Sequence, residues 1–222
     1  MMSYVFDPDG SDHVHTKLLY ESMESEDRSH VELARFGLRA SRDEMFRSVC
    51  VEYLANFGFL SEKDLLIALA DSDEVVRAEA VTASIDIDSF EIKQQLLFMI
   101  ESEEDDFYIA WIIVTLGLKE HEAFEIVYRA RSEWLSSEIV QCSVTFYCAY
   151  MKQEEHEILR FFQYINSDNH LVRGMVANLS DCFAGTVFSN KIEAILAARL
   201  VKEDWVSVKE VLEQKIAVLH GD

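Results

Sequence analysis

Turn-forming residues are scarce in this chain. Its 222 residues include a single proline, Pro8, and seven glycines. A β architecture needs many turns, and turns draw heavily on these two residue types, so their scarcity favours helices. Half of the residues are hydrophobic, which suffices for a core and excludes a disordered chain. The sequence therefore predicts an all-α protein.

Long apolar runs are missing as well. No run approaches the roughly 18 residues that a membrane-spanning helix requires. The first ten residues lack the basic flank and the apolar stretch of a signal peptide. We expect a cytoplasmic protein that does not contact membranes.

The short motifs that mark catalytic and cofactor sites are also absent. The sequence holds no GxGxxG, no phosphate-binding glycine loop, no nucleophile elbow and no CxxC pair. Cys50, Cys142, Cys148 and Cys182 fall in apolar helical stretches, and we expect them to be buried free thiols. The sequence thus predicts no cofactor, no metal ion and no enzymatic activity.

Positive charge is in short supply. The chain has 41 acidic and 20 basic residues, a net charge of −21, and the acidic excess is larger in residues 1–110 than in residues 111–222. Such a chain repels nucleic-acid phosphates and anionic membranes, so we expect no nucleic-acid partner. A basic protein partner is the natural complement. The alternative is that the acidity serves solubility alone.

One helical phrase returns about every 32 residues. Its clearest copies are residues 73–81 (DEVVRAEAV) and 168–176 (DNHLVRGMV). Aligned on Val76 and Val172, the copies lie 96 residues apart, which is three steps of 32. A fixed period of this size indicates stacked helical units that bury a core between neighbours.

The period divides the chain into alternating helices, which we term A and B. B helices are expected to begin near Asp43, Asp73, Asp105, Ser137, Asn169 and Glu203. Five of these six residues are good N-caps, because a side-chain oxygen there accepts from the free amides of the first turn. A helices are expected over 61–70, 89–102, 121–135, 154–165 and 190–200, after a first helical pair over 14–24 and 29–39. Small or apolar residues of the B helices should pack against the next repeat: Cys50, Ala80, Ile112, Val144 and Val176.

Segments 69–81 and 165–173 resemble a HEAT repeat, in which a helix end and an acidic turn lead to Val-Arg on the second helix. The resemblance covers about residues 41–215. It implies a right-handed α-α superhelix, a HEAT-like solenoid of about six helical pairs, with B helices on the concave side. On this basis we expect a polar lead-in over 1–12 and a single HEAT-like α-solenoid domain over 13–222.

Two His-Glu dipeptides, His121-Glu122 and His156-Glu157, offer an enzymatic alternative. They are distantly similar to the motifs of HEAT-like deoxyhypusine hydroxylases, which bind two irons through four such pairs and would imply a metal-dependent oxygenase. This chain has two pairs. The HxH sequence at His13 and His15 is expected to be a solvated helix start. HEAT-like DNA glycosylases grip DNA with a basic concave face, which the acidity of this chain opposes.

Acidic residues recur at the starts of the B helices, and we expect them to form an acidic ridge along one edge of the superhelix. The alternative for each is a helix cap or a solvated turn. The predicted ridge residues are Asp73, Glu74, Glu101, Glu103, Glu104, Asp105, Asp106 and Glu138. Phe107, Tyr108 and Trp111 stand beside the densest run and are possible aromatic anchors, because binding hot spots favour aromatics ringed by polar groups.

These features predict a non-enzymatic module that captures a basic protein partner. The most concrete form is an immunity protein that neutralises a nuclease-type bacterial toxin of the contact-dependent or polymorphic class. A general HEAT-type scaffold or adaptor of a cytosolic complex is the first alternative, and an oxygenase built on the His-Glu pairs is the second. The oligomeric state stays open.

Overall fold

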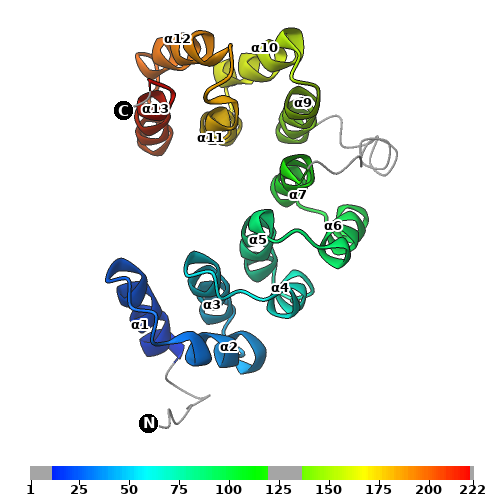
Figure 1. Cartoon of the computed structure of the whole chain (residues 1–222), viewed down its shortest axis with the longest axis vertical. Helices are drawn as coiled ribbons and strands as arrows, with labels where there is room; N and C mark the ends of the chain where they lie inside the picture. Colours follow the sequence, from blue (N-terminus) through cyan, green and yellow to red (C-terminus); the bar gives the residue numbers. More distant parts are fainter. Residues whose placement is uncertain (1–11, 120–136, 221–222) are drawn as a thin grey trace. The chain divides into compact units, whose positions relative to one another are not determined.

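The computed structural model describes residues 12–119 and 137–220, and every regular element within these ranges is a helix (Figure 1). The all-α prediction is confirmed. No helix in the described part of the chain is long and apolar enough to cross a membrane. The chain divides into two compact units, Met1–Ser102 and Glu103–Asp222, which we call unit 1 and unit 2.

Unit 1 consists of two layers of helices. Helices α1 (Asp12–Glu24), α3 (Glu44–Asn56) and α5 (Glu74–Ala83) pack side by side in one layer. Helices α2 (Val31–Ala40), α4 (Glu62–Leu69) and α6 (Phe90–Ser102) form the other, and the 3-10 turn η1 (Ser84–Asp86) ends α5 (Figure 1). Large side chains fill the space between the layers, among them Phe46, Tyr53, Leu54, Leu65 and Leu69. Each such burial stabilises the fold by about 1.5–3 kcal/mol.

Helices α2 and α3 approach each other closely at Gly37. A Cβ atom there would lie 2.6 Å from Cε1 of Phe46 and 2.7 Å from Sγ of Cys50. Because both neighbours are themselves fully buried, neither can move aside. Glycine at this position is therefore a packing requirement.

Unit 2 repeats the two-layer arrangement. Helices α7 (Asp106–Leu118), α9 (Glu138–Lys152), α11 (His170–Asn178) and α13 (Val206–His220) form one layer. Helices α10 (Glu155–Gln163) and α12 (Ser189–Leu200) lie in the other, with the 3-10 turns η3 (Tyr164–Asn166) and η4 (Ser180–Phe183) at helix ends. Phe146, Phe161, Phe162 and Phe183 form a buried aromatic cluster with ring centroids 5.1–6.2 Å apart.

Most predicted helices match observed ones, and the five predicted packing positions are buried. The helix predicted over 121–135 and most of the lead-in over 1–12 lie outside the described residues. The last B helix, α13, begins at Val206, three residues after the start predicted near Glu203. Glu203 is instead a buried residue that accepts hydrogen bonds from two arginines.

Candidate protein-binding surface

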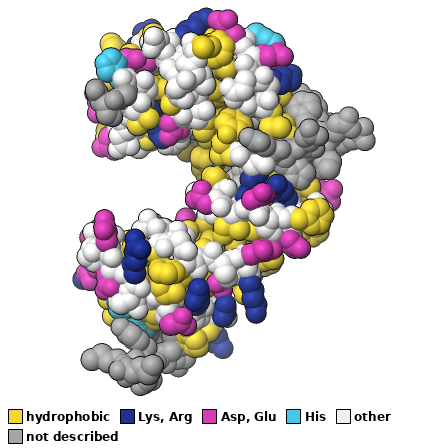
Figure 2. Space-filling model, in the orientation of Figure 1, with side chains coloured by type: hydrophobic (Ala, Val, Ile, Leu, Met, Phe, Trp, Pro, Cys, Tyr) yellow, Lys and Arg dark blue, Asp and Glu magenta, His cyan; other side chains and the backbone are white. Residues whose placement is uncertain are grey.

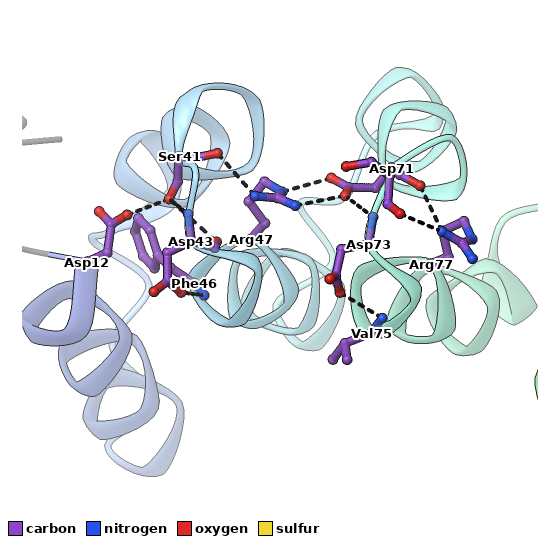
Figure 3. A network of polar contacts seen from close by, with 10 residues as sticks. Asp12, Ser41, Asp43, Phe46, Arg47, Asp71, Asp73, Val75 and Arg77 are labelled. Atoms are coloured by element: carbon purple, nitrogen blue, oxygen red, sulfur yellow. Dashed lines mark hydrogen bonds and ion pairs between the residues drawn. The ribbon is translucent and has the colours of Figure 1, made fainter. Parts of the chain in front are cut away.

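Two arginines tie the turns of unit 1 together: Arg47 of α3, and Arg77 of the repeated phrase in α5 (Figure 3). Arg47 makes a two-pronged ion pair with Asp71, with Nε and Nη2 each 2.8 Å from a carboxylate oxygen. Its Nη1 donates to the carbonyl oxygen of Ser41 at 3.2 Å. Arg77 likewise donates to the carbonyl oxygens of Asp71 and Ser72 in the turn before its own helix.

Arg173 repeats this arrangement in unit 2. It donates to the carbonyl oxygens of Ser167 and Asp168 and binds both carboxylate oxygens of Glu203 at 2.8 and 2.7 Å. Arg199 donates to the same carboxylate at 3.0 Å. The hydrogen bonds from Arg173 chiefly lower the pKa of Glu203, to about 2. These charges hold turns in place and are not available to a partner.

Several predicted ridge residues also have structural roles. Asp73 accepts from the backbone N–H of Val75 at 2.9 Å, and Asp105 accepts from that of Phe107 at 2.8 Å, as helix caps do. Asp43 and Asn169 cap α3 and α11 in the same way, whereas Ser137 makes no side-chain capping bond. Glu103 is only 9% exposed, so its side chain is not part of an exposed surface.

The remaining predicted ridge residues are exposed carboxylates: Glu74, Glu101, Glu104, Asp106 and Glu138. Glu138 also lines a polar pocket of about 300 Å³ together with Arg160 and Tyr164. Glu74 and Glu101 belong to unit 1 and the other three to unit 2. The exposed acids therefore lie on both units.

An exposed acid stands next to a large apolar residue at several helix starts, and we call these acid–apolar pairs. They are Glu44-Met45 in α3, Glu74-Val75 in α5 and Asp106-Phe107 in α7. Met45 is 52% exposed and Val75 38% exposed. Glu138 is also followed by an apolar residue, but Ile139 is buried and does not take part. Figure 2 shows acidic and apolar side chains interspersed on the visible face of both units.

An apolar groove of about 180 Å³ opens on unit 2. Two predicted anchors, Phe107 and Trp111, line it from α7, whereas Tyr108, half-buried like them, does not. The other lining residues are His170, Leu171, Gly174, Met175 and Asn178 of α11 and Ser207, Val208 and Val211 of α13. No sequence pattern points to these eight residues, because only packing brings the three helices together.

Two half-buried carboxylates lie in the middle of helices of unit 1. Burial raises the pKa of Glu52 on α3, and it raises that of Glu79 on α5, with a further contribution from the charge of Glu52. The pKa of Tyr20 on α1 is raised mainly by burial and then by both carboxylates. Three neighbouring helices thus bring these groups together, in a way that helix-start patterns do not reveal.

Of the two His-Glu pairs, only His156-Glu157 lies in the described residues. His121 and Glu122 lie outside the described residues. The carboxylate of Glu157 accepts from Nζ of Lys152 at 3.0 Å, which chiefly lowers its pKa, and His156 is exposed. The described residues include no group of three or more His, Cys, Asp or Glu placed to hold a metal ion.

The four cysteines are free, with Cys50 and Cys142 buried and Cys148 and Cys182 half-buried. Burial raises the pKa of each thiol, to about 11 for Cys182. These thiols are protonated at neutral pH and are poor nucleophiles.

Comparison with models of known protein families and with curated proteins finds no match to this chain.

Proposed function

We propose that this chain is a non-enzymatic binding module, a HEAT-like solenoid that captures a basic protein partner through its B helices. The observation that carries the proposal is the acid–apolar pair, which recurs in α3, α5 and α7. Neither Glu44, Glu74 nor Asp106 forms a side-chain hydrogen bond or ion pair with another described residue. These carboxylates are therefore available to cations from outside.

The chemistry of the pairs suits such capture. Exposed carboxylates attract a basic surface over several ångströms and accelerate its approach, whereas an adjacent apolar side chain stabilises the complex once water is excluded. The net charge of −21 adds a long-range field of the same sign. The acids of the arginine ties and the caps do not contribute new contacts, so the partner-facing acids are a defined subset.

The concrete form that we propose is a cytoplasmic immunity protein for a nuclease-type bacterial toxin. Nucleases bind their substrates in basic clefts, and an acidic partner can occlude such a cleft. The alternative is a general scaffold or adaptor, which would bind a subunit of a larger complex through the same acid–apolar pairs. The genetic neighbourhood separates the two, because a toxin gene beside this one supports the first form.

The test is capture of the neighbouring gene's product by the purified chain. The charge-reversal variant Glu44→Lys/Glu74→Lys/Asp106→Lys should weaken association by more than tenfold, because close charge pairs across interfaces contribute strongly. The matched control is Glu24→Lys/Asp86→Lys/Glu213→Lys, which reverses three exposed acids away from these pairs.

Circular dichroism should show similar helicity for both variants. If the control weakens capture as much as the test variant, bulk charge and not the acid–apolar pairs is responsible. If the unaltered chain captures nothing from the product of its neighbouring gene, the proposed immunity role is wrong.

A further inference from the structure

We infer that the apolar groove of unit 2 binds a basic amphipathic helix, with one of its apolar side chains inserted between α7, α11 and α13. The inference rests on the proposed function, since it names the part of the partner that is recognised. The groove volume of about 180 Å³ is comparable with the roughly 150 Å³ of a cavity that holds benzene. One leucine or phenylalanine side chain is therefore of the right size.

Glycine keeps the groove open. Gly174 lies in its lining, and a Cβ atom there would meet only Cγ2 of Val208, at 3.8 Å. That distance is an ordinary contact, so packing does not demand glycine here, in contrast to Gly37. A glycine in the interior of a helix costs about 1 kcal/mol relative to alanine. A binding site that needs this space explains the residue.

The rim of the groove is apolar and exposed. Leu171 lines the groove at the start of α11 and is 46% exposed, and Trp205, just before α13, is 50% exposed. The ring of Trp205 stacks on that of His170 with centroids 3.7 Å apart and planes 5° apart. Trp205 is thus held in one orientation and can pack on a partner without a large loss of side-chain entropy.

The charge at this end of the groove selects a basic occupant. Asp106 in the first turn of α7, Asp168 before α11 and Asp204 before α13 are exposed, and none bonds through its side chain to another described residue. Arg173 is neutralised by Glu203. The exposed base Lys209 points away from the groove, because it lies on the opposite face of α13 from Ser207, Val208 and Val211.

An amphipathic helix fits these features because it presents apolar and basic side chains at adjacent positions. A second copy of this chain is a poorer occupant, since two molecules each carrying −21 repel one another. The groove therefore takes a segment of opposite charge.

The probe is a short synthetic peptide of leucine and lysine with the leucines on one helical face. Two further peptides serve as controls: one of the same composition in an order that scatters the leucines, and one with glutamate in place of lysine. Affinity is measured by fluorescence anisotropy. The indole N–H signals of the three tryptophans, assigned by Trp→Phe variants, report where the peptide binds, because Trp111 and Trp205 stand at the groove.

Gly174→Leu fills the groove and should weaken binding of the patterned peptide by about tenfold or more. Gly174→Ala, which fills less of the space, should weaken binding by a smaller factor, and Glu213→Lys, which changes charge on the opposite face of α13, should bind nearly as the unaltered chain does. Trp205→Ala provides a second variant with no change in the groove floor and should also weaken binding. The patterned peptide should shift the indole signals of Trp111 and Trp205.

Equal binding of the patterned and scattered peptides, or full binding by Gly174→Leu, would overturn the inference. So would a dimer of the unaltered chain in sedimentation that Gly174→Leu abolishes, because the occupant would then be a second copy. Failure of the two proposals can be told apart. If Gly174→Leu still captures the neighbouring gene's product, the groove is wrong and the proposed function stands. If the peptide binds the groove but that product is not captured, the groove stands and the proposed function is wrong.

Discussion

The two units share a framework and differ on the surface that it supports. In unit 1 the tie joins Arg47 to Asp71, with side chains 12% and 10% exposed, and in unit 2 it joins Arg173 to Glu203, at 5% and 0%. Unit 1 holds the half-buried carboxylates Glu52 and Glu79 on α3 and α5. Unit 2 has an apolar groove lined by α7, α11 and α13.

The repeat register places this difference on particular positions. Residues 79, 111 and 175 are equivalent, since they are separated by 32 and 64 residues, and they are Glu79 in unit 1 but Trp111 and Met175 in unit 2. One residue further on, Ala80 and Val176 are both fully buried. Adjacent positions of the same helix therefore differ: one is buried in the packing between helices in both units, and the other carries different side chains in the two units.

Charges placed at the framework position should break both units alike. Ala80→Glu and Val176→Glu each put a carboxylate where no water and no cation can reach it, and we expect a loss of about 4 kcal/mol or more in the free energy of unfolding. Urea denaturation followed by circular dichroism measures it. Val75→Glu is the control, because this exposed residue lies in a first turn, where acids are tolerated. A small loss in either framework variant would contradict the equivalence of the units.

The arginine ties should differ in strength between the units. Arg173→Met leaves Glu203 buried with Arg199 as its remaining cation, and we expect a loss of about 3 kcal/mol. Arg47→Met should cost less, since Asp71 is more exposed and water can solvate it in part. The two variants are compared by urea denaturation at neutral pH. Equal losses would show that burial does not set the strength of the tie.

Lowering the pH should change the contributions of Glu203 in unit 2 and Glu79 in unit 1 to stability in opposite directions. The pKa of Glu203 is lowered to about 2 from its usual 4.5, so its contribution to stability is present above pH 4.5 and is lost as the pH falls through about 2. The pKa of Glu79 is raised, so protonation favours the folded state, and stability is gained as the pH falls through that raised pKa.

Urea denaturation at a series of pH values from about 2 to about 7, where carboxylates titrate, tests this contrast. Glu203→Gln should lower the free energy of unfolding by about 2 kcal/mol at neutral pH. It should also make the loss of stability at acid pH smaller. Glu79→Gln should raise stability at neutral pH by less than about 1 kcal/mol, because a half-buried charge is removed. The exposed Glu213→Gln should change neither. Destabilisation by Glu79→Gln would mean that its charge is satisfied in the folded state.

The features that the sequence predicts correctly depend on residues close together in the chain. Helix starts at Asp43 and Asp73 were correct because a cap and its first turn lie within a few residues of each other. The role of Glu203 was missed, since its partner Arg173 lies 30 residues away and the tie in unit 1 spans 24. Phe107 and Trp111 were singled out because they stand near acids, and the sequence could not show that helices from later repeats complete a groove around them.

Caps offer the finest comparison between helix starts. Asp105 accepts from the backbone N–H groups of Phe107 and Tyr108, so Asp105→Ala should lower the free energy of unfolding by about 1 kcal/mol. Ser137 occupies the same position before α9 but makes no capping bond, and Ser137→Ala should change stability by less than about 0.5 kcal/mol. Thermal denaturation of both variants measures the difference. Equal effects would mean that the capping bonds of Asp105 contribute no measurable stability. An Asp105→Asn variant, which keeps the acceptor and removes the charge, separates the hydrogen bond from the effect of the charge on the helix dipole.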